Sequence, residues 1–311
     1  MSDKLNKDIL ATIIYYDGLD FPLTVFEVWK NLIRIDYALQ KNDVVKISLA
    51  QVVAHLGGND LAKYVENCNG FYFLRGRKEL VAKRISKNKI SVGKIKKIEK
   101  IIRWLRFVPY VRMVGITGAL AMKNAHAKSD LDVFIVIKNG KIWTGRTLVT
   151  VFLHLLRKRR HGKKIADRVC LNHYTNDQTL EVIIKDLFST NEYMFLFPVY
   201  GWETYKRFQI RNRWIRKMKP TYALSEVPPL KIITDSFISK SVRNFGEVIF
   251  SAAWIEKWLK KIEKKRIMLN PKTHQEGSLV YADDDALVFL PTPHGPLEFE
   301  KFKTKIEELK D

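Results

Sequence analysis

The stretch over residues 111–137, VRMVGITGALAMKNAHAKSDLDVFIVI, constrains the fold of this 311-residue chain more than any other part of it. Its pattern predicts an apolar strand over 111–116, then a tight glycine turn and a short helix over 119–124. A polar loop follows, and a second apolar strand begins near residue 130. We expect the two strands to be adjacent pieces of one sheet, with the glycine turn and the start of the second strand about a dozen residues apart.

Two carboxylates stand at the start of the second predicted strand. Asp130 and Asp132 lie two residues apart, so alternation along the strand places both on one face. Such a pair can hold a divalent cation through oxygen ligands, with triphosphate oxygens completing the shell. Upstream, the backbone N–H groups of Gly118 and Ala119 lie at a helix start, where unpaired donors favour an anion. The sequence therefore predicts a phosphate-binding turn beside a metal-binding acid pair.

This arrangement resembles the signature of the DNA polymerase β-like nucleotidyltransferase superfamily, and in particular its small prokaryotic members with an N-terminal winged-helix domain. The resemblance covers about residues 110–185, and the usual Gly-Ser turn is here Gly118-Ala119. It implies a Mg²⁺-dependent transferase that uses a nucleoside triphosphate such as ATP. The residues that it assigns fall into two groups: metal ligands at Asp130 and Asp132, and phosphate neighbours at Thr117, Gly118, Ala119, Lys123 and Ser129.

Related enzymes carry a third carboxylate on the next strand, where it completes the metal site and helps to deprotonate the incoming hydroxyl. Here residues 168–175 read as that strand, and Asn172 stands on the expected face. An amide oxygen can coordinate a metal but cannot act as a base. Asp167 and Glu181 are the nearest acids, and either replaces Asn172 if the strand register differs.

Composition narrows the class of protein. The chain has 55 Lys and Arg against 33 Asp and Glu, a net charge of +22 that favours nucleic acid or a triphosphate as partner. Its two cysteines cannot build a disulfide framework, and we expect a reducing, cytoplasmic environment. No apolar run is long enough to span a bilayer, so no membrane partner is expected.

Residues 1–90 predict a winged-helix-like domain. Two capping boxes, Thr24 with Glu27 and Ser48 with Gln51, mark helix starts. A short strand over 71–74 and a basic turn follow. In a winged helix such a turn can contact DNA phosphate, but the same domain can instead serve dimerisation.

The remaining chain is divided into a nucleotidyltransferase domain over 91–200 and a basic helical region over 201–311 with a small hairpin. The predicted fold class is thus α+β, with a mixed central sheet. Amphipathic spacing predicts several further helices, and apolar runs predict further strands. The helices cover 91–108, 144–160, 186–200 and 240–267, and the strands cover 180–184, 278–282 and 286–290.

Two functions follow as hypotheses. The first is transfer of a nucleoside monophosphate from a triphosphate to a hydroxyl acceptor, which this sequence does not identify. The second is a degenerate nucleotidyltransferase fold that serves as a nucleotide sensor or scaffold in a DNA-binding regulator. Asn172 and Ala119 favour the second hypothesis, whereas the intact Asp130–Asp132 pair favours the first.

Overall fold

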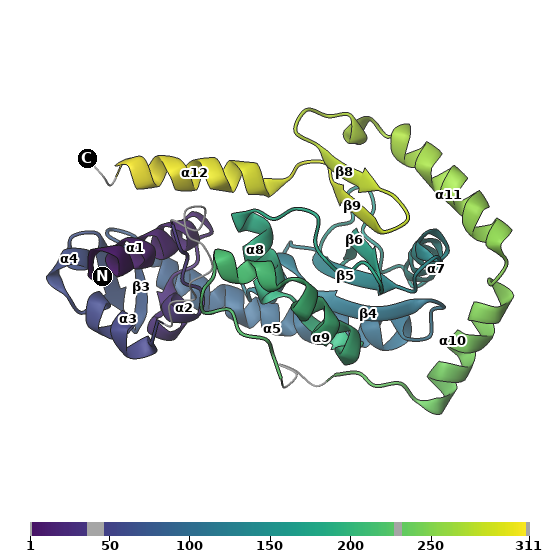
Figure 1. Cartoon of the computed structure of the whole chain (residues 1–311), viewed down its shortest axis with the longest axis horizontal. Helices are drawn as coiled ribbons and strands as arrows, with labels where there is room; N and C mark the ends of the chain where they lie inside the picture. Colours follow the sequence, from purple (N-terminus) through teal and green to yellow (C-terminus); the bar gives the residue numbers. More distant parts are fainter. Residues whose placement is uncertain (1, 36–46, 227–231, 309–311) are drawn as a thin grey trace.

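A computed structural model describes residues 2–35, 47–226 and 232–308 of the chain (Figure 1). It is a mixed α+β structure with one three-stranded and one six-stranded sheet. The helices are α1 (Ser2–Gly18), α2 (Val25–Lys30), α3 (Leu49–Leu56), α4 (Asn59–Ala62), α5 (Glu79–Leu105), α6 (Gly118–Ala121), α7 (Ile142–Leu155), α8 (Leu187–Phe195), α9 (Trp202–Arg211), α10 (Phe237–Ile249), α11 (Ala253–Met268) and α12 (His294–Glu308), with 3₁₀ turns η1 (Arg213–Lys217) and η2 (Pro271–Thr273). The strands are β1 (Leu23–Thr24), β2 (Val65–Cys68), β3 (Phe71–Leu74), β4 (Val111–Ile116), β5 (Leu131–Ile137), β6 (Val169–Asn176), β7 (Phe197–Tyr200), β8 (Leu279–Ala282) and β9 (Ala286–Leu290).

The N-terminal helices α1–α4 pack around the small antiparallel sheet, whose strand order is β1-β3-β2. Both predicted capping boxes are confirmed, because Thr24 and Ser48 each accept the backbone N–H three residues on. The predicted basic turn is less free than the sequence indicates. Arg77 pairs with Asp17 at 3.1 Å and with Asp20 at 2.6 Å. Its guanidinium is therefore engaged in ion pairs within the N-terminal unit.

Helix α5 joins the two sheets and is longer than predicted. The sequence indicates a helix over 91–108, whereas α5 runs unbroken from Glu79 to Leu105. The proposed domain boundary at residue 90 therefore falls inside a helix. Its first turns contact the N-terminal unit, where Arg84 pairs with Glu27 of α2 at 2.8 Å, and its later turns bury Ile98 and Ile102 in the central core. The two halves of the helix bury their apolar side chains against different partners. The sequence therefore does not show one continuous helical period over the whole length of α5.

The central sheet has the strand order β7-β4-β5-β6-β9-β8. Strands β5 and β6 are parallel and every other adjacent pair is antiparallel. β4 and β5 are almost wholly buried, which explains their unbroken apolar runs. The C-terminal hairpin β8–β9 joins this sheet through β6, so residues 201–311 are not a separate layer. α12 then returns to pack against α1, and Lys305 pairs with the buried Asp17 at 2.6 Å.

Two predicted segments differ in the structure. Residues 186–200 form a helix and then a strand, because β7 pairs with the edge of β4. Residues 180–184 form no strand. Their apolar side chains pack instead, with Leu180 and Val182 buried against Phe208 of α9. Tertiary packing thus overrides local propensity at both places.

The predicted helix over 240–267 is two helices, α10 and α11, which run along the outer side of the central sheet (Figure 1). The break follows from a distant residue. Lys141 donates from Nζ to the carbonyl oxygens of Phe250 (3.1 Å) and Ser251 (2.7 Å), which caps the end of α10. No helix in the described ranges is long and apolar enough to cross a membrane.

Candidate active site

The glycine turn, the acid pair and β6 meet at one pocket of about 580 Å³. The end of β4 brings the turn, the start of β5 brings the acids and the start of β6 brings Cys170 and Asn172. Helix α8 and the segment 291–298 complete the wall. Of the predicted site residues, the lining includes Thr117, Gly118, Ala119, Asp130, Asp132 and Asn172.

Gly118 lies directly against Asp132. Its φ of +63° is in the left-handed region, and a Cβ at this position would lie 2.9 Å from Asp132 Oδ2. Glycine is therefore required both by the backbone and by the carboxylate. The backbone N–H of Thr117 donates to the carbonyl of Asp132 at 3.2 Å, which holds the turn to the strand.

Asp130 forms an ion pair with Arg160, a residue that follows α7. Arg160 donates from Nη1 to Asp130 Oδ2 at 2.6 Å and to Cys170 Sγ at 3.4 Å. Residues 157–164, RKRRHGKK, are a basic run, and the guanidinium of Arg160 is the part of it that enters the pocket lining. Ligand atoms of Asp130, Asp132 and Cys170 lie within 4.8 Å of one another.

The pKa of Asp132 is raised to about 7 in this pocket. Burial is the main cause, and the neighbouring carboxylates of Asp130 and Glu192 add to it. Arg160 opposes the rise without cancelling it. Burial and repulsion destabilise the ionised form of this carboxylate, so a bound cation would stabilise it strongly.

Glu192 of α8 is, with Arg160, a site residue that sequence reasoning missed. Its carboxylate accepts hydrogen bonds from the Thr117 side chain and from the backbone N–H of Gly118. Burial raises its pKa to about 7. It therefore occupies one of the two backbone donors that the sequence assigns to phosphate, the N–H of Gly118. Only its place on α8 brings it there, and no local motif marks it.

The third acidic position stays an amide. Asn172 donates from Nδ2 to Asp132 Oδ1 at 3.3 Å, which orients its amide toward the acid pair. Asp167 is not among the residues that line the pocket. It pairs with Lys94 at 2.7 Å and with Lys97 at 2.5 Å, and these lysines keep its pKa low against the effect of burial. Glu181 is exposed and pairs with Lys185.

Two predicted phosphate neighbours lie outside the pocket lining. Lys123 has an exposed side chain and a φ of +56°. Ser129 holds its own loop, because its hydroxyl accepts from the backbone N–H of His126 at 3.0 Å. Its carbonyl accepts from Lys94 at 2.8 Å. The structure thus gives Ser129 a role in shaping the loop before the acid pair.

Alternation along a strand would place His173 on the face opposite to Asn172, but β6 shifts register against β5 between Asp132 and Phe134, and His173 lines the same pocket as Asn172. The Tyr193 hydroxyl is 2.5 Å from its Nδ1, and its ring lies edge-on to Phe134. Burial lowers its pKa to about 3, so it stays neutral at physiological pH. This histidine is a packed structural residue.

The donor set of the pocket suits a hard cation. Carboxylate oxygens are the ligands that Mg²⁺ prefers, and it commonly keeps positions for water and phosphate oxygens. Cys170 is a poor ligand for it, because burial raises the pKa of the thiol and keeps it protonated. Comparison with protein-family models, with curated proteins and with solved structures finds no match to this chain.

Proposed function

We propose that the protein is a Mg²⁺-dependent nucleotidyltransferase, in which a hydroxyl of the acceptor attacks the α-phosphorus of a nucleoside triphosphate, loses its proton and takes up the nucleoside monophosphate while pyrophosphate leaves. The observation that carries this proposal is the contact between Gly118 and Asp132 at one wall of a 580 Å³ pocket. A metal-binding carboxylate and a backbone turn that can donate to phosphate are thereby adjacent. The resemblance to polymerase β-like enzymes and the net charge of +22 agree with this function.

In this proposal Asp130 and Asp132 hold the Mg²⁺, which when bound neutralises charge on the transferred phosphoryl group. Arg160, 2.6 Å from Asp130, would add a positive charge at the acid pair. The turn at Thr117–Ala119 positions the phosphates, which displace Glu192 or meet it in its protonated form. A pKa near 7 makes protonated Glu192 accessible at neutral pH. Positioning and electrostatics then supply most of the rate.

The test is transfer of labelled nucleotide with Mg²⁺, in the parent protein and in the Asp130→Asn/Asp132→Asn variant. A cell lysate and each of the four triphosphates supply the unknown acceptor and nucleotide. Glu181→Gln is the matched control, because Glu181 is an exposed acid outside the pocket. We expect label transfer by the parent and the control and a loss of more than about a hundredfold in the double variant. Equal transfer by all three proteins would exclude the assignment.

A second candidate function is a nucleotide sensor within a DNA-binding regulator. Two observations favour it: Asn172 stands where related enzymes have an acid, and Glu192 accepts from the Gly118 N–H. The N-terminal unit would then contact DNA. Tight DNA binding that the double variant retains, together with no label transfer by the parent, would support the sensor over the enzyme.

A further inference from the structure

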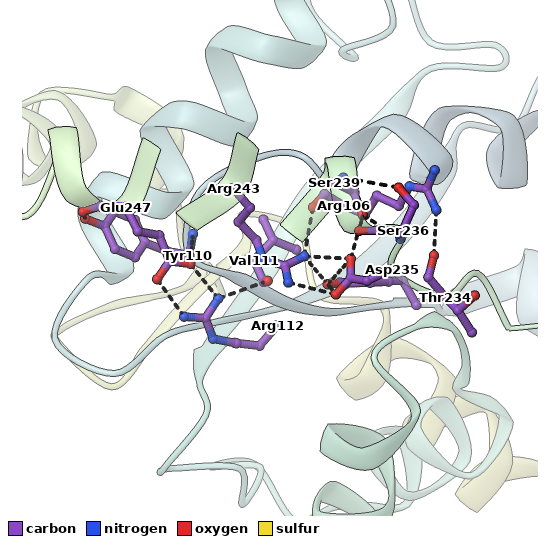
Figure 2. A network of polar contacts seen from close by, with 11 residues as sticks. Arg106, Tyr110, Val111, Arg112, Thr234, Asp235, Ser236, Ser239, Arg243 and Glu247 are labelled. Carbon is purple, nitrogen blue, oxygen red and sulfur yellow. Dashed lines mark hydrogen bonds and ion pairs between the residues drawn. The ribbon is translucent and has the colours of Figure 1, made fainter. Parts of the chain in front are cut away.

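Helix α10 is amphipathic, and its polar side, not its apolar side, faces the rest of the protein. Arg243 donates to Asp235 at 2.8 and 2.7 Å and to the Arg106 carbonyl at 2.9 Å. Glu247 accepts from Arg112 at 2.8 and 3.0 Å (Figure 2). Ionic and hydrogen-bonded contacts therefore hold this helix in place.

The opposite side of α10 is apolar and exposed. Phe237 is 85% exposed and Phe245 is 69% exposed, so most of the surface of both rings faces solvent. Ile238, Val242, Val248 and Ile249 complete the same side at helical spacing and are also exposed. A continuous apolar stripe of this kind is rare on a water-facing surface and marks an interaction site.

Helix α11 continues this outer face with a different composition. Trp254 and Trp258 are exposed, at 68% and 56%. Exposed lysines lie among them at Lys257, Lys261 and Lys265. Tryptophan and lysine beside an aliphatic stripe are typical of helices that lie in a membrane interface, where lysine meets lipid phosphate.

Charge is sorted between the two sides of α10 and α11. Their acidic residues are Glu247, Glu256 and Glu263, and none of them is exposed. Glu256 accepts from the backbone N–H groups of Trp143 and Thr144, both at 2.9 Å, and so caps the start of α7. Glu263 contacts Arg146 and Thr147. The outer face is left with lysines, aromatic rings and aliphatic side chains.

We propose that this outer face of α10 and α11 lies on an anionic lipid surface. Charge decides between partners: a second copy would oppose lysine to lysine, whereas anionic headgroups complement every exposed charge of the face. The expectation of no membrane partner rested on spanning length, and a helix that lies on a bilayer needs no such length. Figure 1 places α10 and α11 at the end of the molecule far from α1–α4, which leaves the N-terminal unit clear of the surface.

The test is flotation of the full chain with phosphatidylcholine vesicles, with and without phosphatidylserine, at low and high salt. The apolar variant is Phe245→Ser, and Leu155→Ser is its matched control, since Leu155 is 75% exposed on α7. We expect flotation only with the anionic vesicles. Phe245→Ser should weaken it roughly tenfold and leave the fold intact, while the control binds like the parent. Gln at Lys257, Lys261 and Lys265 should weaken it roughly fivefold per lysine.

Several results would overturn the proposal. One is no flotation with either vesicle, and another is flotation that high salt abolishes and Phe245→Ser leaves unchanged, because nonspecific attraction of a +22 chain gives that pattern. Sedimentation velocity without lipid provides a third. A dimer that Phe245→Ser dissociates would assign the face to a second copy of the chain. Vesicle binding is independent of the proposed nucleotidyltransferase activity, so the two proposals can fail separately.

Discussion

The acid pair should make the folded protein less stable as pH rises, and Asp132→Asn should reverse this. The pKa of Asp132 is about 7 in the folded state against about 3.8 in an unfolded chain. The folded protein therefore holds a proton over a range in which the unfolded chain has lost it, so stability falls between those two values. Below the unfolded pKa both states are protonated and the penalty disappears.

The magnitude follows from the width of that range. Each pH unit between the two pKa values costs about 1.4 kcal/mol, so the parent loses about 3 kcal/mol from this group between pH 5 and pH 7. Asn keeps an oxygen for the Asn172 amide and removes the charge. We therefore compare the free energy of unfolding of Asp132→Asn with that of the parent, without added metal. This difference should be about 2 to 3 kcal/mol more favourable to the variant at pH 8 than at pH 5.

The assay is thermal unfolding of both proteins at pH 5 and pH 8 in the presence of a chelator. The variant should melt a few degrees above the parent at pH 8, and this advantage should shrink at pH 5. The same variant should lose label transfer, which is the expected trade between stability and a charged active site. A variant that melts at or below the parent at pH 8 would refute the argument that Asp132 is a desolvated, repelled carboxylate.

Three further predictions concern the glycine turn, the metal site and helix α10. Gly118→Ala should lower stability by about 1 to 3 kcal/mol and abolish transfer, because φ is +63° and Asp132 fills the space; a variant that matches the parent in urea unfolding and in activity would contradict this. The apparent affinity for Mg²⁺, measured by calorimetry, should rise about tenfold from pH 6 to pH 8 as a group of pKa about 7 ionises; a flat profile would exclude Asp132 as ligand. Arg243→Met should cost about 3 kcal/mol by leaving Asp235 unpaired and should expose α10 to limited proteolysis, whereas Lys240→Met, at an exposed position of the same helix, should change neither; equal cleavage of both variants would argue against the ionic anchoring of α10.

The sequence predicted the centre of the fold better than its periphery. Strands β4 and β5 are buried on both faces, so their composition alone marks them, and the turn at Gly118 needs a residue that tolerates positive φ. Asp130 and Asp132 were found for the same local reason. Patterns of this kind depend on neighbours within a few residues.

Features that depend on distant contacts could not be predicted. Glu192 reaches the turn only because α8 packs beside it, and Lys141 binds the carbonyls of Phe250 and Ser251 directly after the end of α10. Arg160 enters the pocket from a basic run in which no residue stands out in the sequence. The segment 291–298 lines the pocket after a hairpin that joins the sheet edge. In each case the partner lies more than 25 residues away or on another element.

The most direct test of the proposed metal site is Mn²⁺ binding measured by electron paramagnetic resonance, with and without a triphosphate, since Mn²⁺ accepts the same oxygen ligands as Mg²⁺. We predict one bound ion whose affinity increases when the triphosphate is added. We also predict that Asp130→Asn/Asp132→Asn loses this ion and that Glu181→Gln retains it. Binding that is unchanged in the double variant would contradict the central claim that these two carboxylates, beside the Gly118 turn, hold the metal.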